Sequence, residues 1–165
     1  MMDNTEGKWS EMEWNGEEGE LVLFMGEYQH SLDDKGRLII PAKLREGLGE
    51  KFILTRGLDR SLFVYPLSEW ENIEERMKAL PTTQADTRAF VRMFFSGAVE
   101  CEPDKQWRIS IPLNLRTHAQ IDKDLYILGV STRIEIWARE VWEDYSAHAE
   151  ESYEELAEKI VGIGI

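Results

Sequence analysis

A regular pattern begins at Phe24, from which apolar or small residues alternate with polar ones as far as Leu32. A period of two residues is typical of a strand with one buried face. The stretch "DDKG" that follows is rich in turn-forming residues, and Gly36 is free to adopt a positive φ there. "RLII" then begins a second apolar run. The pattern therefore predicts two strands joined by a tight turn.

The next segment predicts a short helix followed by a hairpin. Pro41 suits a first helical turn, and Gly47 and Gly49 can end the helix. "KFILT" and "LFVY" are apolar, β-branched and aromatic, and "RGLDRS" separates them, which indicates a β-hairpin. Ser68 and Glu71 have the spacing of a capping box. The helix that they would begin carries one apolar face made of Trp70, Ile73, Met77 and Leu80.

The whole order of elements then recurs. A shift of 71 residues aligns Asp33 with Asp104 and Arg37 with Arg108, and a shift of 72 aligns "LFVY" at 62–65 with "IEIW" at 134–137. Two copies are too few for a solenoid, so we expect one α+β domain with a pseudo-two-fold axis. A further helix around 83–94 links the halves. A C-terminal helix is predicted from the spacing of Trp142, Tyr145, Ala149, Tyr153, Leu156 and Ile160.

Residues 1–22 do not share this pattern. They are acidic and rich in glycine, and Trp9 and Trp14 show no periodicity, which predicts disorder. An alternative is that residues 1–21 are an untranslated leader read in frame, because codons for "EEG" at 17–19 can spell a ribosome-binding site. The natural start would then lie near Val22, Leu23 or Met25.

The formal net charge is −13, which taken alone argues against a nucleic-acid partner. The acidic residues are concentrated at the ends. Residues 1–20 contribute −6 from seven acids and one lysine, and residues 135–160 contribute −7 from nine acids and two bases. Between 33 and 60, seven bases outnumber five acids. The chain is therefore locally basic around the repeated turn.

Several classes of protein are disfavoured. No run of 18 apolar residues exists, so no transmembrane helix is expected, and the acidic start is not a signal peptide. Cys101 is the single cysteine, which excludes an intrachain disulfide and favours a small buried side chain. The histidines, His30, His118 and His148, are not spaced as metal ligands, and no nucleophile elbow or phosphate-binding glycine loop occurs. We therefore expect no enzyme, no metal and no cofactor.

The repeated turn has the form Asp-x-x-x-Arg, and two interpretations of it compete. In the structural one, Asp33 accepts hydrogen bonds from turn amides, and Arg37 pairs with it at the start of the next strand. In the functional one, two basic loops related by pseudo-symmetry bind a ligand that is itself repetitive, such as duplex DNA. The basic residues concerned are Lys35, Arg37, Lys43, Arg45, Lys105, Arg108 and Arg116.

Two segments closely resemble the MraZ family of the AbrB-like swapped-hairpin superfamily. "FMGEYQHSLDDKGRLIIPAKLREGLGEKFILTRGLDRSLFVYP" is similar to its first half, and "DKQWRISIPLNLR" with "GVSTRIEIWAREVWE" is similar to its second half. The resemblance covers roughly residues 24 to 165. It implies two tandem swapped-hairpin β modules with flanking helices, ring-shaped homo-oligomers and double-stranded DNA as partner. It also implies transcriptional regulation through tandem direct repeats upstream of the division and cell-wall gene cluster.

By this resemblance, Asp33 and Arg37 match the first signature of the family, and Asp104 and Arg108 match the second. The chain departs from the family at Trp107, where the family has glycine as at Gly36. A tryptophan in a left-handed turn costs on the order of 1 kcal/mol. We therefore expect a reshaped second turn. Trp107 could stack on a sugar or base, pack against a neighbouring subunit, or be an engineered or erroneous residue.

The expected organisation is an N-terminal extension (1–22), a first module (23–80), a linking helix (81–94) and a second module with the C-terminal helix (95–165). The apolar hairpins "KFILT" and "YILGV" exceed what one small domain need bury, which also favours a homo-oligomer. We expect a repressor in the cytoplasm, bound to the nucleoid. The alternative is an antitoxin-like or other protein-interaction module, although antitoxins usually carry one hairpin module and a disordered tail.

Overall fold

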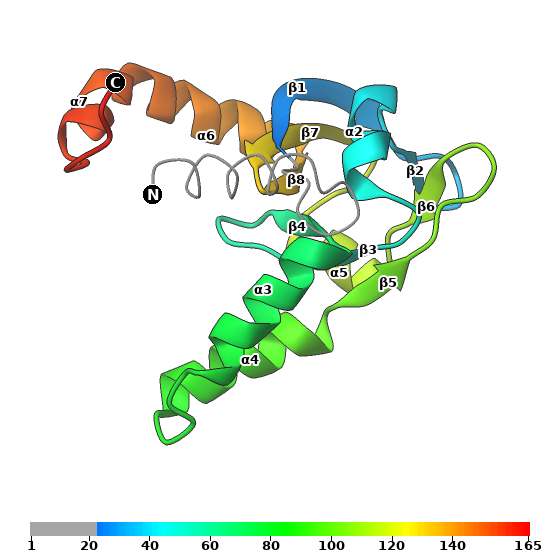
Figure 1. Ribbon diagram of the computed structural model, residues 1–165. Coiled ribbons are helices and arrows are strands. Elements are labelled where there is room, and N and C mark those ends of the chain that lie inside the picture. Colours follow the sequence, from blue (N-terminus) through cyan, green and yellow to red (C-terminus); the bar gives the residue numbers. More distant parts are fainter. Residues whose placement is uncertain (1–22) are drawn as a thin grey trace, which may run out of the picture.

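The order of elements predicted for one half occurs twice in the computed structural model, which describes residues 23–165 (Figure 1). The prediction of disorder for residues 1–22 falls outside the described residues. The first half comprises β1 (Phe24–Ser31), β2 (Arg37–Ile39), α2 (Ala42–Leu48), β3 (Phe52–Arg56), β4 (Leu62–Pro66) and α3 (Leu67–Lys78). After α4 (Ala85–Ser96) the second half comprises β5 (Val99–Cys101), β6 (Arg108–Ser110), α5 (Leu113–His118), β7 (Asp124–Ser131), β8 (Arg133–Ala138), α6 (Arg139–Glu151) and α7 (Tyr153–Glu158).

The two halves exchange strands. The larger sheet has the order β1-β7-β8-β4-β3-β5, so the first strand of each half pairs with the third strand of the other. The smaller sheet is a two-stranded antiparallel ribbon of β2 and β6. Neither half can complete its own sheet. The α+β class and the pseudo-two-fold arrangement predicted from the repeat are thus confirmed.

The position of the pseudo-two-fold axis follows from the register. Leu38 of β2 faces Ile109 of β6, its own counterpart under the shift of 71. Phe63 of β4 faces Glu135 of β8, its counterpart under the shift of 72. A residue opposite its own equivalent lies on the axis. The axis therefore passes through the centre of the ribbon and the centre of the larger sheet.

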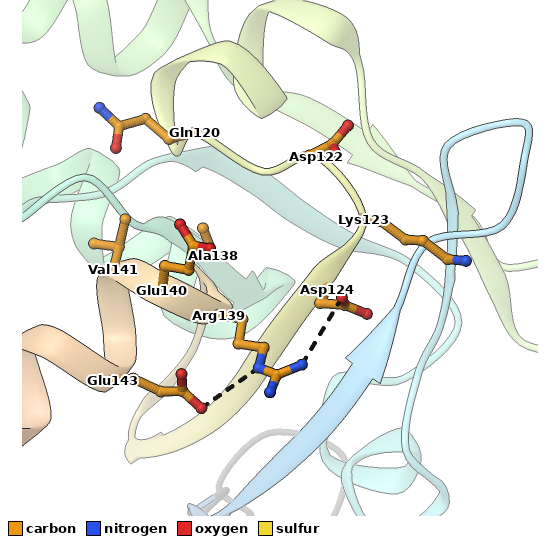
Figure 2. A pocket seen from close by; sticks show the side chains of 9 residues that line it. All are labelled: Gln120, Asp122, Lys123, Asp124, Ala138, Arg139, Glu140, Val141 and Glu143. Carbon is orange, nitrogen blue, oxygen red and sulfur yellow. Dashed lines mark ion pairs between the residues drawn. The ribbon is translucent and has the colours of Figure 1, made fainter.

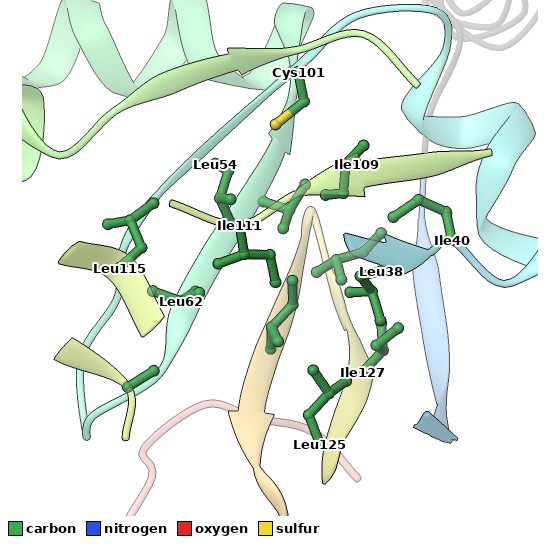
Figure 3. Packing of buried hydrophobic residues seen from close by; sticks show 14 of the residues in the cluster. Leu38, Ile40, Leu54, Leu62, Cys101, Ile109, Ile111, Leu115, Leu125 and Ile127 are labelled. Atoms are coloured by element: carbon green, nitrogen blue, oxygen red, sulfur yellow. The ribbon is translucent and has the colours of Figure 1, made fainter. Parts of the chain in front are cut away.

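The main core lies between the ribbon and the larger sheet. Leu38 and Ile109 point inward from the ribbon and belong to the same buried cluster as Leu125 and Ile127 of β7 (Figure 3). Leu38 and Leu125 have no exposed surface. Burying such a side chain stabilises the fold by roughly 1.5–3 kcal/mol. The ribbon is therefore held rigidly by its inner face, and its outer face is left to solvent.

Cys101 is buried in this cluster, as its lone occurrence predicted. Burial raises the pKa of its thiol to about 12, and the neighbouring charge of Glu100 adds to the rise. A thiol with such a pKa stays protonated at neutral pH and is a poor nucleophile. Cys101 is therefore a packing residue.

Several helix boundaries differ from the prediction. No side chain caps α3: Ser68 lies inside the helix, because Pro66, with φ −58°, leads β4 directly into the first turn. The capping box is thus wrong. Gly47 lies inside α2, and Gly49, with φ +75°, ends it. The predicted C-terminal helix is interrupted at Ser152, which separates α6 from α7.

Two helical arms extend from the larger sheet in Figure 1, one made of α3 and α4 and the other of α6 and α7. The linking helix α4 begins and ends two residues later than the predicted 83–94. It packs against α3 through stacked rings of Trp70 and Phe94, whose centroids lie 5.5 Å apart. In the part of the chain that the structure describes, no helix is long and apolar enough to cross a lipid bilayer.

Candidate nucleic-acid interface

The first repeated turn is locked by Asp33. Its Oδ1 accepts hydrogen bonds from the backbone N–H groups of Lys35 and Arg37, each at 2.9 Å. Its Oδ2 accepts from Nε of Arg37 at 2.7 Å. Gly36 has φ +75° and donates its N–H to the Asp33 carbonyl oxygen at 3.0 Å. The structural interpretation of the motif is therefore confirmed, and it fixes the direction in which Arg37 leaves the turn.

The second turn has the same geometry, contrary to expectation. Asp104 accepts from the N–H groups of Gln106 and Arg108 at 2.9 and 3.0 Å, and from Nε of Arg108 at 2.7 Å. Trp107 takes φ +60° and donates its N–H to the Asp104 carbonyl oxygen at 2.9 Å. The turn is not reshaped, because these bonds and the contacts of Trp107 with the core outweigh a strain of about 1 kcal/mol.

Both aspartates are more acidic than usual. The backbone hydrogen bond from Arg37 lowers the pKa of Asp33 most. Desolvation, the next-largest effect, opposes it, and the Arg37 side chain and the Lys35 amide each lower the pKa further. Asp104 has its pKa lowered in the same way, first by the backbone hydrogen bond from Arg108. Both carboxylates are therefore ionised at neutral pH, as the pairing with arginine requires.

The outer face of the β2–β6 ribbon carries both signature arginines. Arg37 lies opposite Ser110, and Ile39 lies opposite Arg108, so the arginines are placed diagonally about the pseudo-two-fold axis. Their side chains are 29% and 27% exposed. Within residues 23–165, the terminal nitrogens Nη1 and Nη2 of both guanidinium groups have no hydrogen-bond acceptor. Both arginines therefore lie on one face of the ribbon, each with two terminal nitrogens that no other described residue engages.

A hollow of about 420 Å³ is lined by both arginines. Glu100, Glu102 and Asp104 line it too, so its formal charge does not favour an anion inside. The guanidinium groups of the two arginines are instead suited to acceptors that a partner presents to the ribbon, such as the edges of stacked bases.

Each half places an arginine over the turn of the other half. Arg45 of α2 donates from Nε to the Ile40 carbonyl oxygen at 2.9 Å, and its Cζ lies 5.4 Å from the centre of the Trp107 ring. Arg116 of α5 makes the same bond to Ile111 at 2.9 Å and lies beside Gly36, where an added Cβ would be 3.3 Å from its Cζ. The structure therefore brings Arg45 and Arg116 to the ends of the ribbon.

The three lysines predicted to bind DNA, Lys35, Lys43 and Lys105, are exposed, but they do not occupy equivalent positions in the two halves. Lys35 and Lys105 both lie in the repeated turns, and Lys43 lies in the first turn of α2. Under the shift of 71, Lys35 corresponds to Gln106, and Lys105 corresponds to Asp34. The two turns therefore present different charges around the same arginine.

Sequence reasoning missed Ile39 and Ser110, which share the outer face of the ribbon with the arginines. Ile39 is 46% exposed, unusual for an aliphatic residue in a strand whose next neighbours are buried. The sequence does contain a signal for them. Ile39 is two positions from Arg37 and Ser110 is two positions from Arg108, and residues two apart in a strand point to the same face.

A hollow of about 600 Å³ lies elsewhere, between the start of β7 and the start of α6 (Figure 2). Arg139 occupies its centre, with nitrogen atoms 4.0 Å from an Asp124 carboxylate oxygen and 3.5 Å from one of Glu143. Four acids and two bases line the hollow, so its formal charge is negative, and its lining has no nucleophile beside a base. Among the described residues, no group of three histidine, cysteine or acidic side chains is placed to hold a metal ion.

Comparison with known proteins gives a consistent result. Residues 23–93 and 94–163 each match the family described as "MraZ protein, putative antitoxin-like". A protein of Pelotomaculum thermopropionicum named "Transcriptional regulator MraZ" is 62% identical over 143 residues, covering 87% of this chain and 99% of the relative. Proteins of the same name from Desulforamulus reducens and Desulfitobacterium hafniense are each 60% identical, covering 86% and 87% of this chain and 99% and 100% of the relatives.

Proposed function

Because the chain belongs to the MraZ family, we propose that it is a transcriptional regulator that binds double-stranded DNA through the outer face of the β2–β6 ribbon. The reported relatives are named as regulators of transcription and not as enzymes. The observation that carries the proposal is the pair of arginines, Arg37 and Arg108, held on one face of the ribbon by their bonds from Nε to the aspartates, with terminal nitrogens that no other described residue engages.

A two-stranded ribbon is narrow enough to enter the major groove of B-DNA. There an arginine can donate two parallel hydrogen bonds to O6 and N7 of guanine, which discriminates against other bases by about 1–3 kcal/mol. The aspartates engage Nε and thereby orient the guanidinium planes, which leaves the terminal nitrogens for this contact. Ile39, beside Arg108, offers an apolar contact for a thymine methyl group.

The phosphate contacts are assigned to the basic residues that flank the ribbon, namely Lys35, Lys43, Arg45, Lys105 and Arg116. They carry no sequence information but fix the orientation of the protein on the duplex. The acidic ends of the chain, at −6 and −7, oppose non-specific attraction to DNA. Binding therefore depends on local contacts and should weaken steeply with added salt.

We further propose that the protein is a repressor and works as a ring-shaped homo-oligomer in the cytoplasm, on nucleoid DNA. Its operator consists of tandem direct repeats upstream of the division and cell-wall gene cluster. Neighbours in a ring are related head to tail, so they meet direct rather than inverted repeats. Adjacent subunits reach the same face of the duplex when repeats recur about every 10–10.5 bp.

This arrangement predicts how affinity depends on operator spacing. Insertion of five base pairs between two repeats turns the second repeat to the opposite face of the duplex and should remove its contribution. Because a ring is curved and DNA is stiff, affinity should stop rising after three or four repeats. Gel-shift titration with one to six repeats, and with the spaced operator, measures both effects. Equal affinity for the spaced operator, or for a single repeat, would contradict the ring on direct repeats.

A second candidate function, binding of a protein in the manner of an antitoxin, is supported by the wording of the family description and by the exposed acidic C-terminal helix. The two candidates differ in the surface they use. Substitutions on the ribbon would impair DNA binding alone, whereas substitutions in residues 153–165 would impair capture of a protein partner.

A further inference from the structure

The pseudo-symmetry of the molecule is broken at its helical arms. Under the shift of 72, α3 and α6 correspond, and Trp70 corresponds to Trp142. α4 covers the aromatic face of α3, where the rings of Trp70 and Phe94 stack. α6 has no following helix that packs back in this way, because the chain continues outward into α7 (Figure 1). The second arm therefore ends in a helix and tail that no other part of residues 23–165 covers.

The end of this arm carries an apolar stripe. Tyr153, Leu156 and Ile160 are spaced by three and four residues, and are 68%, 45% and 54% exposed. Val161 and Ile165 follow at 99% and 94%. Single exposed apolar residues are ordinary, but a continuous stripe indicates a contact surface. Tyr153 and Leu156, three residues apart in α7, have the spacing of the anchors with which an amphipathic helix enters a groove, and Ile160 follows two residues after the helix ends at Glu158.

The other arm contains an apolar groove of matching character. The groove lies between α3 and α4, has a volume of about 300 Å³ and has an apolar lining that includes Met77, Leu80, Val91 and Phe95. Leu80 is 39% exposed. No residue of α6 or α7 lines the groove, and the two arms extend separately in Figure 1. The groove is therefore open to a second molecule.

The charges around the two surfaces are opposite. The residues lining the groove include Lys78, Arg88 and Arg92 and no acid. α7 bears Glu154, Glu155 and Glu158 beside its apolar stripe. Complementary charge at the edge of an apolar contact favours one partner over others and fixes its register.

We propose that α7 and the C-terminal tail of one copy dock into the α3–α4 groove of a second copy, with Leu156 as the central anchor. The two surfaces are different, so the contact is head to tail and each molecule keeps one groove and one tail for further neighbours. Repetition of the contact closes a ring or extends a filament. The inference rests on the proposed homo-oligomer and names the surface that would build it.

Two substitutions test the two sides of this contact one at a time. Leu80→Glu places a carboxylate in the groove, and Leu156→Glu places one in the stripe. Both leucines are partly exposed in the single chain, so the fold should survive, which circular dichroism checks. Leu58→Glu is the matched control, because Leu58 is 57% exposed in the β3–β4 loop and belongs to neither surface.

Sedimentation velocity at micromolar concentration gives the decisive comparison. The unaltered chain and Leu58→Glu should form assemblies, whereas Leu80→Glu and Leu156→Glu should each sediment as single chains of 19.2 kDa. An equimolar mixture of the two defective variants should form a complex of two chains, because one intact groove and one intact tail remain.

Two outcomes would overturn the inference while leaving the proposed DNA-binding homo-oligomer in place. One is an assembly that persists in either variant, and the other is a mixture that stays monomeric although the unaltered chain assembles. Loss of assembly with Leu156→Glu alone would show that the tail docks elsewhere. An unaltered chain that is itself monomeric would contradict both the oligomer and this interface.

Discussion

The aspartates of the two turns, Asp33 and Asp104, should make the free energy of unfolding depend on pH in the acid range. Their pKa values are lower in the folded chain than in the unfolded one, so the stabilisation is present above the usual aspartate pKa of about 4 and is lost as pH falls through the lower folded values. Asp33→Asn with Asp104→Asn should therefore be less stable than the unaltered chain at pH 7, with a difference that shrinks below pH 4.

Urea midpoints at pH 7, 5, 4 and 3 measure this difference. Asp34→Asn is the control, because Asp34 accepts no side-chain hydrogen bond within residues 23–165 and lies in the same turn. A difference between the double variant and the unaltered chain that stays constant down to pH 3 would contradict the assignment.

The free-energy cost of the left-handed conformation at position 107 can be measured with two substitutions. Trp107→Ala and Trp107→Gly both remove the ring and its contact with Arg45, but only glycine adopts φ +60° without steric strain. The glycine variant should be more stable than the alanine variant by about 1 kcal/mol. Thermal or urea unfolding of the pair tests this. A more stable alanine variant would show that the turn opens once the ring is gone.

At the level of single residues, the sequence predicted the partners within each turn, because Asp33 and Arg37 interact over only four positions. It did not predict that Trp107 would keep the turn unchanged. That outcome depends on contacts with the distant core and on Arg45 from the other half. A local cost of about 1 kcal/mol could be foreseen, but the tertiary contacts that offset it could not.

Among the elements, the pairing of β1 with β7 depends on a close approach of two backbones. Gly26 faces Gly129, and a Cβ added at Gly129 would lie 2.2 Å from the Met25 nitrogen. Because backbone rather than a flexible side chain stands in the way, Gly129→Ala should separate the strands. We expect a loss of stability of at least 3 kcal/mol, of the order seen for severe core changes.

Chemical denaturation of Gly129→Ala against Ser31→Ala tests this expectation. Ser31 is exposed at the end of the same strand pair and should change stability by no more than about 0.5 kcal/mol. A Gly129→Ala protein as stable as the control would show that β1 does not lie where the structure places it.

Most strands and helices could be predicted because their signals are local. The alternation from Phe24 and the apolar pair "KFILT" and "LFVY" indicated β1 and the β3–β4 hairpin, both of which are found. The exchange of β1 and β5 between halves has no local signal, since it joins residues about a hundred positions apart for β1 with β7 and nearly fifty apart for β5 with β3. The capping box failed for a local reason, because Pro66 already sets the start of α3.

For the molecule as a whole, the repeat alone was enough to predict a pseudo-two-fold axis. It did not indicate that the axis runs through the ribbon and places Arg37 and Arg108 on one face, because that follows from the register of β2 with β6. The basic turns could be found from the sequence, but their assembly into one surface required the exchanged strands.

The most direct test of the account is the affinity of the unaltered protein and of ribbon variants for operator and scrambled DNA, measured by fluorescence anisotropy over a range of salt. Arg37→Ala with Arg108→Ala should weaken operator binding by about 1–3 kcal/mol for each arginine. Arg37→Lys with Arg108→Lys should keep the salt-dependent binding to scrambled DNA but lose preference for the operator, because lysine cannot donate the paired hydrogen bonds. Arg139→Ala, at the start of α6 and away from the ribbon, should bind as the unaltered protein does. If the folded alanine double variant binds the operator with unchanged affinity, the ribbon is not the DNA-reading surface.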